Sequence, residues 1–316
     1  MKILNMEKYA DYPKPLRKHK YKFIFLMLLP SLASFAVFYV AINLQSILLA
    51  FREFTGYTPD GGETYIWSLE NFRNIFRELN SSATAATQLL QATKNTLLLY
   101  FFGNIITFPL ACVISYYIWK KMPAHKLFRI VFYLPHIISS VVMVIIFKNI
   151  VAPNGLFGAL SVVFTGHLSP PFLAQDKTAI WFVLLYNTWM GFAGPYLLIT
   201  AALMRVPQDV IESAQLDGIT PFKEFTKICV PLVWPTIYII LLQKIAGLLA
   251  ADGPILLLTN GTASTYTLGF WSYMQVVVSH SYEFPAAVGI LMTLVVAPLA
   301  LLARWLMSLV NKDIEY

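Results

Sequence analysis

The sequence predicts an all-α, polytopic membrane protein with six transmembrane helices. Three observations support this fold class. The 316 residues are 58% hydrophobic and only 12% charged, whereas soluble domains carry roughly a quarter charged residues. The apolar residues lie in long blocks with few ionised side chains, and most basic residues flank these blocks on one side. This composition excludes disorder, a coiled coil and most soluble enzymes.

Six blocks are long enough to cross a membrane, since a helix spanning hydrocarbon needs about 20 mainly apolar residues. The fifth block contains Lys244 and Asp252 but stays apolar on both sides of each. The first block is too long for the core of a signal peptide and is expected to be a retained anchor. The predicted spans are Phe23 to Phe51, Asn95 to Trp119, Ile130 to Phe147, Thr178 to Met204, Ile228 to Thr259 and Phe284 to Ala303.

The basic residues predict that both termini are cytoplasmic, because loops on the cytoplasmic side carry an excess of Lys and Arg. Sixteen basic residues lie in the segments on the side of the N-terminus, and four lie in the clear loop positions on the other side. The net charge of +7 is therefore attributed to the basic residues of the cytoplasmic segments, and no nucleic-acid partner is expected. The four outer residues are Arg52, Arg73, Arg77 and Lys177.

These spans divide the chain into a basic cytoplasmic tail (1–22), a six-span transmembrane domain (23–308) and a second cytoplasmic tail (309–316). The outer loop 52–92 holds a Thr-Pro-Asp-Gly-Gly turn and a stretch suited to an interfacial helix. A docking surface and an interfacial helix without a partner are equally expected there. Cys112 and Cys229 are interpreted as packing residues. The five histidines have no metal-site spacing, and neither a metal nor a catalytic residue is expected.

The cytoplasmic loop 205–227 is neither apolar enough to cross the membrane nor disordered in composition. Pro207 suits the first position of a helix, and Gly218 suits the position just after its end. These residues predict a helix of about three turns, with a second helix from near Pro221 through Phe225 into the fifth span. An apolar stripe on the first helix is expected to face away from water. It comprises Val210, Ile211, Ala214 and Gln215.

This loop resembles the "EAA" loop of binding-protein-dependent ABC importer permeases. The resemblance rests on Glu212-Ser213-Ala214, on Asp217-Gly218 and on Phe225, and continues through Ile228, Pro231 and Pro235. Ser213 and Ile219 stand where that family usually has Ala. Two further stretches are similar. Arg129 to His136 resembles the start of the family's third-span region, and Pro153 to Leu156 resembles the turn that follows it. Leu258-Thr259-Asn260-Gly261, with Thr265 and Leu268, resembles a stretch of the carbohydrate-uptake branch, although a proline of that stretch is missing.

The resemblance implies the type I importer permease fold and a role in taking up an oligosaccharide across a bacterial or archaeal plasma membrane. It implies four kinds of partner, namely a second six-span permease that is expected to be non-identical, two ABC ATPase subunits, an extracytoplasmic solute-binding protein and the carbohydrate. The loop would be the coupling helix that contacts the ATPase. The sequence has no Gly-x-x-x-x-Gly-Lys-Ser/Thr loop, so ATP and Mg are expected on the ATPase and this chain is not expected to be an enzyme. The residues assigned to coupling are Glu212, Ser213, Ala214, Asp217, Gly218 and Phe225.

Polar side chains within the spans are candidates for a substrate pathway, because ionisable groups in a membrane usually face a bundle interior or a cavity. Asp252 is favoured as a pathway residue and Lys244 as a structural one. On a continuous helix they would lie about 12 Å apart, too far to pair, and Asp252-Gly253-Pro254 could break the helix. Asn104, Asn187 and Gln243 could bind sugar hydroxyls, and Trp189, Trp271 and Tyr273 could stack on a sugar ring. For each of these six, helix packing or an interfacial position is the alternative.

Three other functions compete with this hypothesis. The same type of importer could carry a glycerol-phosphate compound or a polyamine, and Lys244 is the one intramembrane cation that favours a phosphate ester. An ion-coupled secondary transporter would need several buried acids and repeated halves; the spans show one clear acid, Asp252, and no evident repeat. A membrane enzyme would need a convergent set of catalytic residues.

Overall fold

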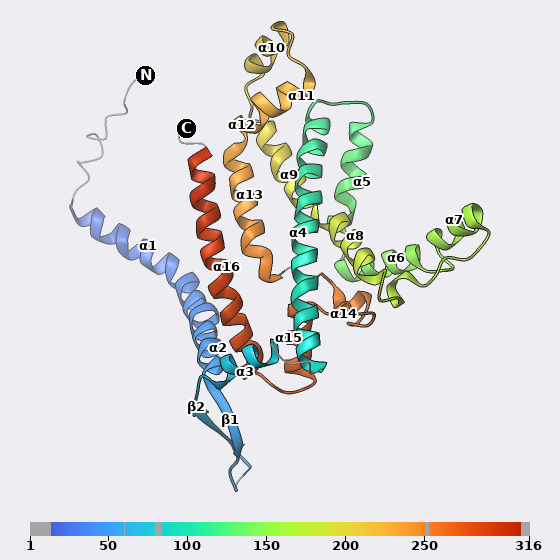
Figure 1. The fold of residues 1–316 in the computed structure, drawn as a ribbon. Helices are drawn as coiled ribbons and strands as arrows, with labels where there is room; N and C mark the ends of the chain where they lie inside the picture. Colours follow the sequence, from blue (N-terminus) through green and yellow to red (C-terminus); the bar gives the residue numbers. More distant parts are fainter. Residues whose placement is uncertain (1–13, 60, 80–83, 251–252, 311–316) are drawn as a thin grey trace. The chain divides into compact units, whose positions relative to one another are not determined.

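A computed structural model describes residues 14–59, 61–79, 84–250 and 253–310 (Figure 1). Two compact units make up the chain. The first comprises Met1–Phe72 and Tyr282–Ala287, and the second comprises Arg73–Ser281 and Val288–Tyr316.

The first unit begins with a long apolar helical rod. It consists of α1 (Lys14–Ser34), a π-helical segment (Phe35–Ala41) and α2 (Ile42–Ala50). Residues 20–48 are exposed along this rod, as expected for a helix whose neighbours are lipid tails. The rod contains a candidate span from Lys20 to Ala50, which confirms the first predicted block.

A β-hairpin follows the rod and is a small exception within an otherwise helical fold, whose predicted class is confirmed. Strand β1 (Arg52–Tyr57) pairs antiparallel with β2 (Glu63–Trp67). The Thr58 amide donates to the Gly62 carbonyl at 2.6 Å, and Gly61 has φ +82°, a conformation that glycine adopts without steric cost. The prediction recognised this turn but not the strands, although aromatic and β-branched residues around a Gly-rich turn are typical of hairpins.

The predicted interfacial helix exists as α3 (Glu70–Leu79). Its first turn is held to the end of the rod by Asn71, which is buried. The Asn71 side-chain amide donates to the carbonyls of Ala50 at 3.1 Å and Arg52 at 2.7 Å. The start of this helix is therefore fixed to the hairpin by buried hydrogen bonds, which surface loops seldom provide.

The second unit is organised around α4 (Thr84–Trp119), which packs along α8 (Ala179–Gly191) and α9 (Ala193–Leu203) (Figure 1). Candidate spans run from Thr87 to Trp119 and from Ala179 to Leu203, and both confirm predicted blocks. A short 3₁₀ turn (Phe172–Ala174) precedes α8. Helix α16 (Glu283–Val310) contains the candidate span Glu283–Met307, which matches the last predicted block.

The predicted third span, Ile130 to Phe147, is wrong because the chain breaks inside it. Helix α5 (His125–Ile137) ends and α6 (Ser140–Val151) begins across two extended residues, Ile138 and Ser139. Serine favours helix starts over helix interiors because its hydroxyl competes for backbone groups, and the Ser139-Ser140 pair marks this break. The segment that is long and apolar enough to span is instead 140–165, formed by α6 and α7 (Leu156–Thr165).

The turn predicted between α6 and α7 is confirmed and requires its glycines. The Gly155 amide donates to the Ala152 carbonyl at 2.9 Å. A Cβ on Gly155 would lie 1.8 Å from the Asn149 carbonyl oxygen, and one on Gly158 would lie 1.6 Å from that of Pro153. Any other residue would force these backbone segments apart.

The fifth predicted block is bent and broken. Before it lie α10 (Gln208–Leu216) and α11 (Pro221–Glu224), and the chain continues through a π-helical turn (Phe225–Cys229) into α12 (Val230–Leu232). Helix α13 (Trp234–Ala246) then turns away by 76° and ends in a 3₁₀ turn, Gly247–Ala250. Gly253, with φ +59°, leads into α14 (Ile255–Leu258), and α15 (Leu268–Val277) follows. The regular helix thus ends before the predicted Asp-Gly-Pro break.

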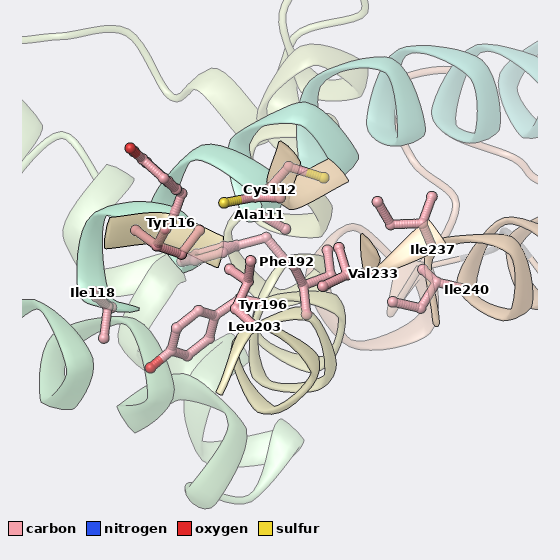
Figure 2. Close-up of a cluster of buried hydrophobic side chains, with 13 residues drawn as sticks. Ala111, Cys112, Tyr116, Ile118, Phe192, Tyr196, Leu203, Val233, Ile237 and Ile240 are labelled. Carbon is pink, nitrogen blue, oxygen red and sulfur yellow. The ribbon is translucent and has the colours of Figure 1, made fainter. Parts of the chain in front are cut away.

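Among the described residues, five helices are long and apolar enough to span a membrane, and the bent pair Pro221–Leu232 and Trp234–Ala246 makes a sixth if it counts as one span. The core of the second unit contains two clusters of buried apolar side chains. One lies between α4, α9 and α13 (Figure 2) and includes Cys112, Cys229 and Ile211. The other joins α6, α8 and α14. The two cysteines are buried and unpaired, which confirms their interpretation as packing residues.

Candidate functional site

Helix α10 has a defined start and a defined end. Pro207 is extended (φ −60°, ψ 130°) and flanks the helix, so it is not the first helical residue as predicted. Gly218 has φ +75°. Its amide donates to the Gln215 carbonyl at 3.0 Å, and the Ile219 amide donates to that of Ala214 at 3.1 Å. These two bonds form a Schellman motif, and they confirm the predicted glycine stop.

The apolar stripe predicted on α10 is only partly correct. Ile211 is 1% exposed and joins the buried cluster between α4, α9 and α13, whereas Val210 is 40% exposed. Ala214 is half-buried and Gln215 is exposed. Val210 and Ile211 are neighbours in the sequence but point 100° apart around the helix axis. Burial of Ile211 therefore leaves Val210 exposed, and only one edge of α10 contacts the core.

The residues assigned to coupling lie mostly on the free side of this loop. Glu212, Ser213 and Asp217 are exposed, and the Ser213 hydroxyl donates to the Val210 carbonyl at 3.0 Å. Leu216 is 90% exposed and Phe222, just beyond the glycine stop, is 76% exposed. Leu216 lies outside every candidate span, and its exposure fits a contact surface for another protein.

Glu224 fixes this loop to the end of α4, and sequence reasoning missed it. Its side chain is 3% exposed and lies 2.6 Å from the Lys120 ammonium. The Tyr116 hydroxyl donates to the same carboxylate at 3.1 Å, and the Gln215 amide donates to its second oxygen at 3.3 Å. Phe225, the last of the assigned residues, packs its ring on that of Tyr116, with 5.1 Å between centroids.

The sequence holds a pattern that could have identified Glu224. Its position belongs to the helix face that also carries Phe225, Ile228 and Cys229, which are apolar and at least half-buried. An acid on such a face is costly to bury unless a cation and hydrogen-bond donors surround it. The loop is therefore a small helix on a rigid, charge-paired base.

A second group of predicted residues lines a cavity of about 400 Å³ between α4, α8, the end of α13 and the glycines Gly247 and Gly253 that follow it. Asn104 and Lys244 are joined there, since the Lys244 ammonium donates to the Asn104 side-chain oxygen at 2.7 Å. Asn187 lies on the same cavity against Gly253, where a Cβ would come within 2.7 Å of the Asn187 amide. The cavity is therefore lined by the ammonium of Lys244 and by the side-chain amides of Asn104 and Asn187. Several glycines, which have no side chain, form other parts of its wall.

The other predicted pathway residues do not line this cavity. Gln243 is exposed. Trp189 packs against Phe147 and Tyr186, Trp271 is 3% exposed in the core, and Tyr273 stacks on Phe270. Asp252 lies outside the described residues, so its assignment stays a prediction.

The stretch that resembled the carbohydrate-uptake branch forms a buried polar network. The hydroxyls of Thr259 and Thr265 lie 2.6 Å apart. Asn95 on α4 donates to the carbonyls of Ser264 and Tyr266 at 2.8 and 2.7 Å. These bonds attach the loop before α15 to α4, so the stretch supports the architecture at the end of the molecule opposite α10 (Figure 1).

The arrangement of packed apolar helices, a polar intramembrane cavity and a protruding, rigidly based loop helix defines a membrane component of a transport system. The chain belongs to the family of binding-protein-dependent transport system inner membrane components, which residues 103–316 match. This result confirms the family indicated by the EAA-like loop.

Curated relatives include maltose/maltodextrin transport system permease proteins MalF. The protein from Klebsiella aerogenes is 24% identical over 252 residues, which cover 78% of this chain and 46% of the relative. The protein from Vibrio cholerae is 26% identical over 267 residues, which cover 79% and 50%. The chain thus spans about half the length of these relatives.

Solved structures share the fold. A chain of a bacterial ABC transporter involved in the import of the acidic polysaccharide alginate matches with a TM-score of 0.79 and 21% identity, covering 95% of this chain and all of that chain. A chain from a bacterial alginate ABC transporter, in complex with an alginate pentasaccharide-bound periplasmic protein, matches with a TM-score of 0.77 and 22% identity, covering 93% and 97%. The predicted ABC importer permease fold is therefore confirmed.

Proposed function

We propose that this chain is the permease subunit of an ATP-driven importer that takes up an oligosaccharide across the plasma membrane of a bacterium or archaeon. Membership of the transport-component family and similarity to maltodextrin permeases support this proposal. Both termini would lie in the cytoplasm, as the distribution of basic residues predicts.

The observation that carries the proposal is the Glu224 network beneath α10. A coupling element must transmit movement without deforming, and the ion pair with Lys120 joins the loop directly to α4. Exposed Glu212 and small Ser213 would contact the ATPase, where Glu212 can pair with a cation. ATP and Mg would be held by two ATPase subunits, and their closure would move α10 and α4 as one body.

The cavity beside Lys244 would form part of the substrate pathway. Its amides and ammonium can donate hydrogen bonds to hydroxyl, ether and carboxylate oxygens of a glycan. A second, non-identical permease would complete the pathway, and an extracytoplasmic binding protein would deliver the substrate.

Two measurements test the importer proposal. The first is purification of the tagged chain from its native membrane, with co-purifying subunits identified by mass spectrometry. We expect an ATPase with a Walker loop and a second permease. Recovery of this chain alone, together with uptake that follows an ion gradient and persists without ATP, would support the secondary transporter instead.

The second measurement compares uptake of a radiolabelled maltodextrin or alginate oligosaccharide by cells that carry wild-type chain, Gly218→Pro or Glu212→Lys. Both substitutions should leave membrane insertion intact and abolish ATP-coupled uptake. Normal uptake by both variants would remove the coupling assignment from α10.

Lys244 favours one alternative substrate class, an anionic solute such as an acidic glycan or a glycerol-phosphate compound. Its hydrogen-bond partner Asn104 is neutral, so the ammonium can still bind a carboxylate or phosphate. Competition between a neutral and an acidic oligosaccharide in the same uptake assay decides between the classes.

A further inference from the structure

A second cavity, of about 540 Å³, lies at the α10 end of the second unit. It is enclosed by the end of α4, the start of α5, the end of α9 and the start of α10, which Figure 1 shows at the same end of the molecule. This cavity is distinct from the one beside Lys244, with which it shares no lining residue. Its lining includes five basic side chains and no acid, and the basic residues are Lys120, Lys121, His125, Lys126 and Arg129.

The structure accounts for only part of this positive charge. Lys120 is paired with Glu224 at 2.6 Å, and the Arg129 guanidinium interacts with the Tyr196 hydroxyl. Lys121 and Lys126 are exposed, and the ion pair between Lys120 and Glu224 involves neither of them. Cations gathered around one hollow repel one another unless an anion enters it.

The backbone of the connection between α4 and α5 places these cations at the cavity. Lys121 has φ +53° and Ala124 has φ +60°, and left-handed backbone is disfavoured for residues with a Cβ. The Tyr117 hydroxyl holds this turn by donating to the Pro123 carbonyl at 2.5 Å. The turn is thereby compact enough to present Lys121 and Lys126 to one site.

The surface next to the cavity is apolar. On α5, Leu127 is 60% exposed and Ile130 is 63% exposed, immediately beside the basic residues. A ligand that fits both features carries a phosphate for the cations and acyl chains for the apolar face. Basic pockets between transmembrane helices bind the headgroups of anionic lipids in this way.

We propose that this cavity binds the phosphate headgroup of an anionic phospholipid from the membrane leaflet on the α10 side. The lipid would lie against Gln208 and Ile211 of α10, so its presence would stabilise the loop helix in addition to the Glu224 network. The site needs no assumption about the transported solute.

The test uses the full chain, purified in detergent with whatever subunits accompany it and then delipidated. Native mass spectrometry measures binding of added phosphatidylglycerol and of phosphatidylcholine. The variant Lys121→Gln/Lys126→Gln removes the two exposed lysines of the cavity lining. The control Lys20→Gln/Lys22→Gln removes the same charge from the exposed basic start of the first candidate span.

We expect wild type and control to prefer phosphatidylglycerol, and the cavity variant to bind it about thirtyfold more weakly, since each Lys near an anionic lipid contributes about a factor of five. Binding of phosphatidylcholine should not change. Equal binding of the two lipids by wild type, or equal losses in variant and control, would overturn the proposal. Binding of inorganic phosphate as tight as that of phosphatidylglycerol would assign the cavity to a soluble anion and exclude the lipid. If the double variant does not fold, Lys126→Gln alone should weaken binding about fivefold.

Discussion

Replacing Glu224 with glutamine should loosen the candidate coupling loop without unfolding the protein. The substitution keeps the shape of the side chain but removes its charge. The Lys120 ammonium then loses its partner at 2.6 Å, and the bonds from Tyr116 and Gln215 lose their charged acceptor. Because these contacts join α10 and α11 to the end of α4, the effect should be confined to that region.

The size of the effect follows from burial. Breaking a buried ion pair by removing one partner costs about 3–5 kcal/mol. The Glu224 side chain is 3% exposed, but that of Lys120 is 22% exposed, so water can solvate the ammonium once it is released. We therefore expect the lower end, about 3 kcal/mol, which corresponds to an increase of about 10²-fold in local opening.

Hydrogen exchange followed by mass spectrometry measures this opening directly. Peptides covering residues 208–224 should exchange about 10²-fold faster in Glu224→Gln, while peptides from α8 should be unchanged. Glu212→Gln is the matched control, since it removes an exposed acid from the same loop. Equal exchange in Glu224→Gln and wild type, or an equal effect of the control, would refute the role assigned to this carboxylate.

Three further predictions concern glycines and the intramembrane lysine. Gly158→Ala should prevent correct packing of α6 and α7, because a Cβ would lie 1.6 Å from a backbone oxygen, whereas Gly194→Ala has open space and should be tolerated; thermal unfolding in detergent compares them. Gly218→Ala should weaken the end of α10 by about 1 kcal/mol, since alanine disfavours φ +75°, and amide exchange of the capping residues measures this loss. Lys244→Met should lower uptake of an acidic oligosaccharide about 10- to 100-fold, the loss expected for a hydrogen bond to a charged group, and should lower uptake of a neutral one less.

The sequence predicted features that depend on neighbouring residues or on composition. The spans at both ends of the chain, the glycine stop of α10 and the turn before α7 each follow from a local pattern, and the structure confirms them. The family also followed from the sequence, because Glu212 and the Asp217-Gly218 pair stand at fixed spacing within one loop.

The sequence did not predict features where a local pattern was ambiguous. The β-hairpin lay within a loop that was interpreted only as a turn and a helix. The block from Ile130 to Phe147 is mainly apolar and contains no residue of fixed charge. Its break lies at the Ser139-Ser140 pair, and mean hydropathy alone does not distinguish such a block from a continuous membrane helix.

The tertiary structure alone decided which distant polar residues meet. Lys244 and Asn104 are 140 positions apart, and Glu224 and Lys120 are more than 100 apart. A buried charge is costly unless it has a partner, but the sequence does not show which residue that partner is. Hydrophobic burial along α4, α8 and α9 sets the positions of the backbones, and these positions determine the pairs. Periodicity and charge therefore predicted the class of protein, whereas the charge-paired loop base and the cavities beside Lys244 and Lys121 arise only when the helices pack.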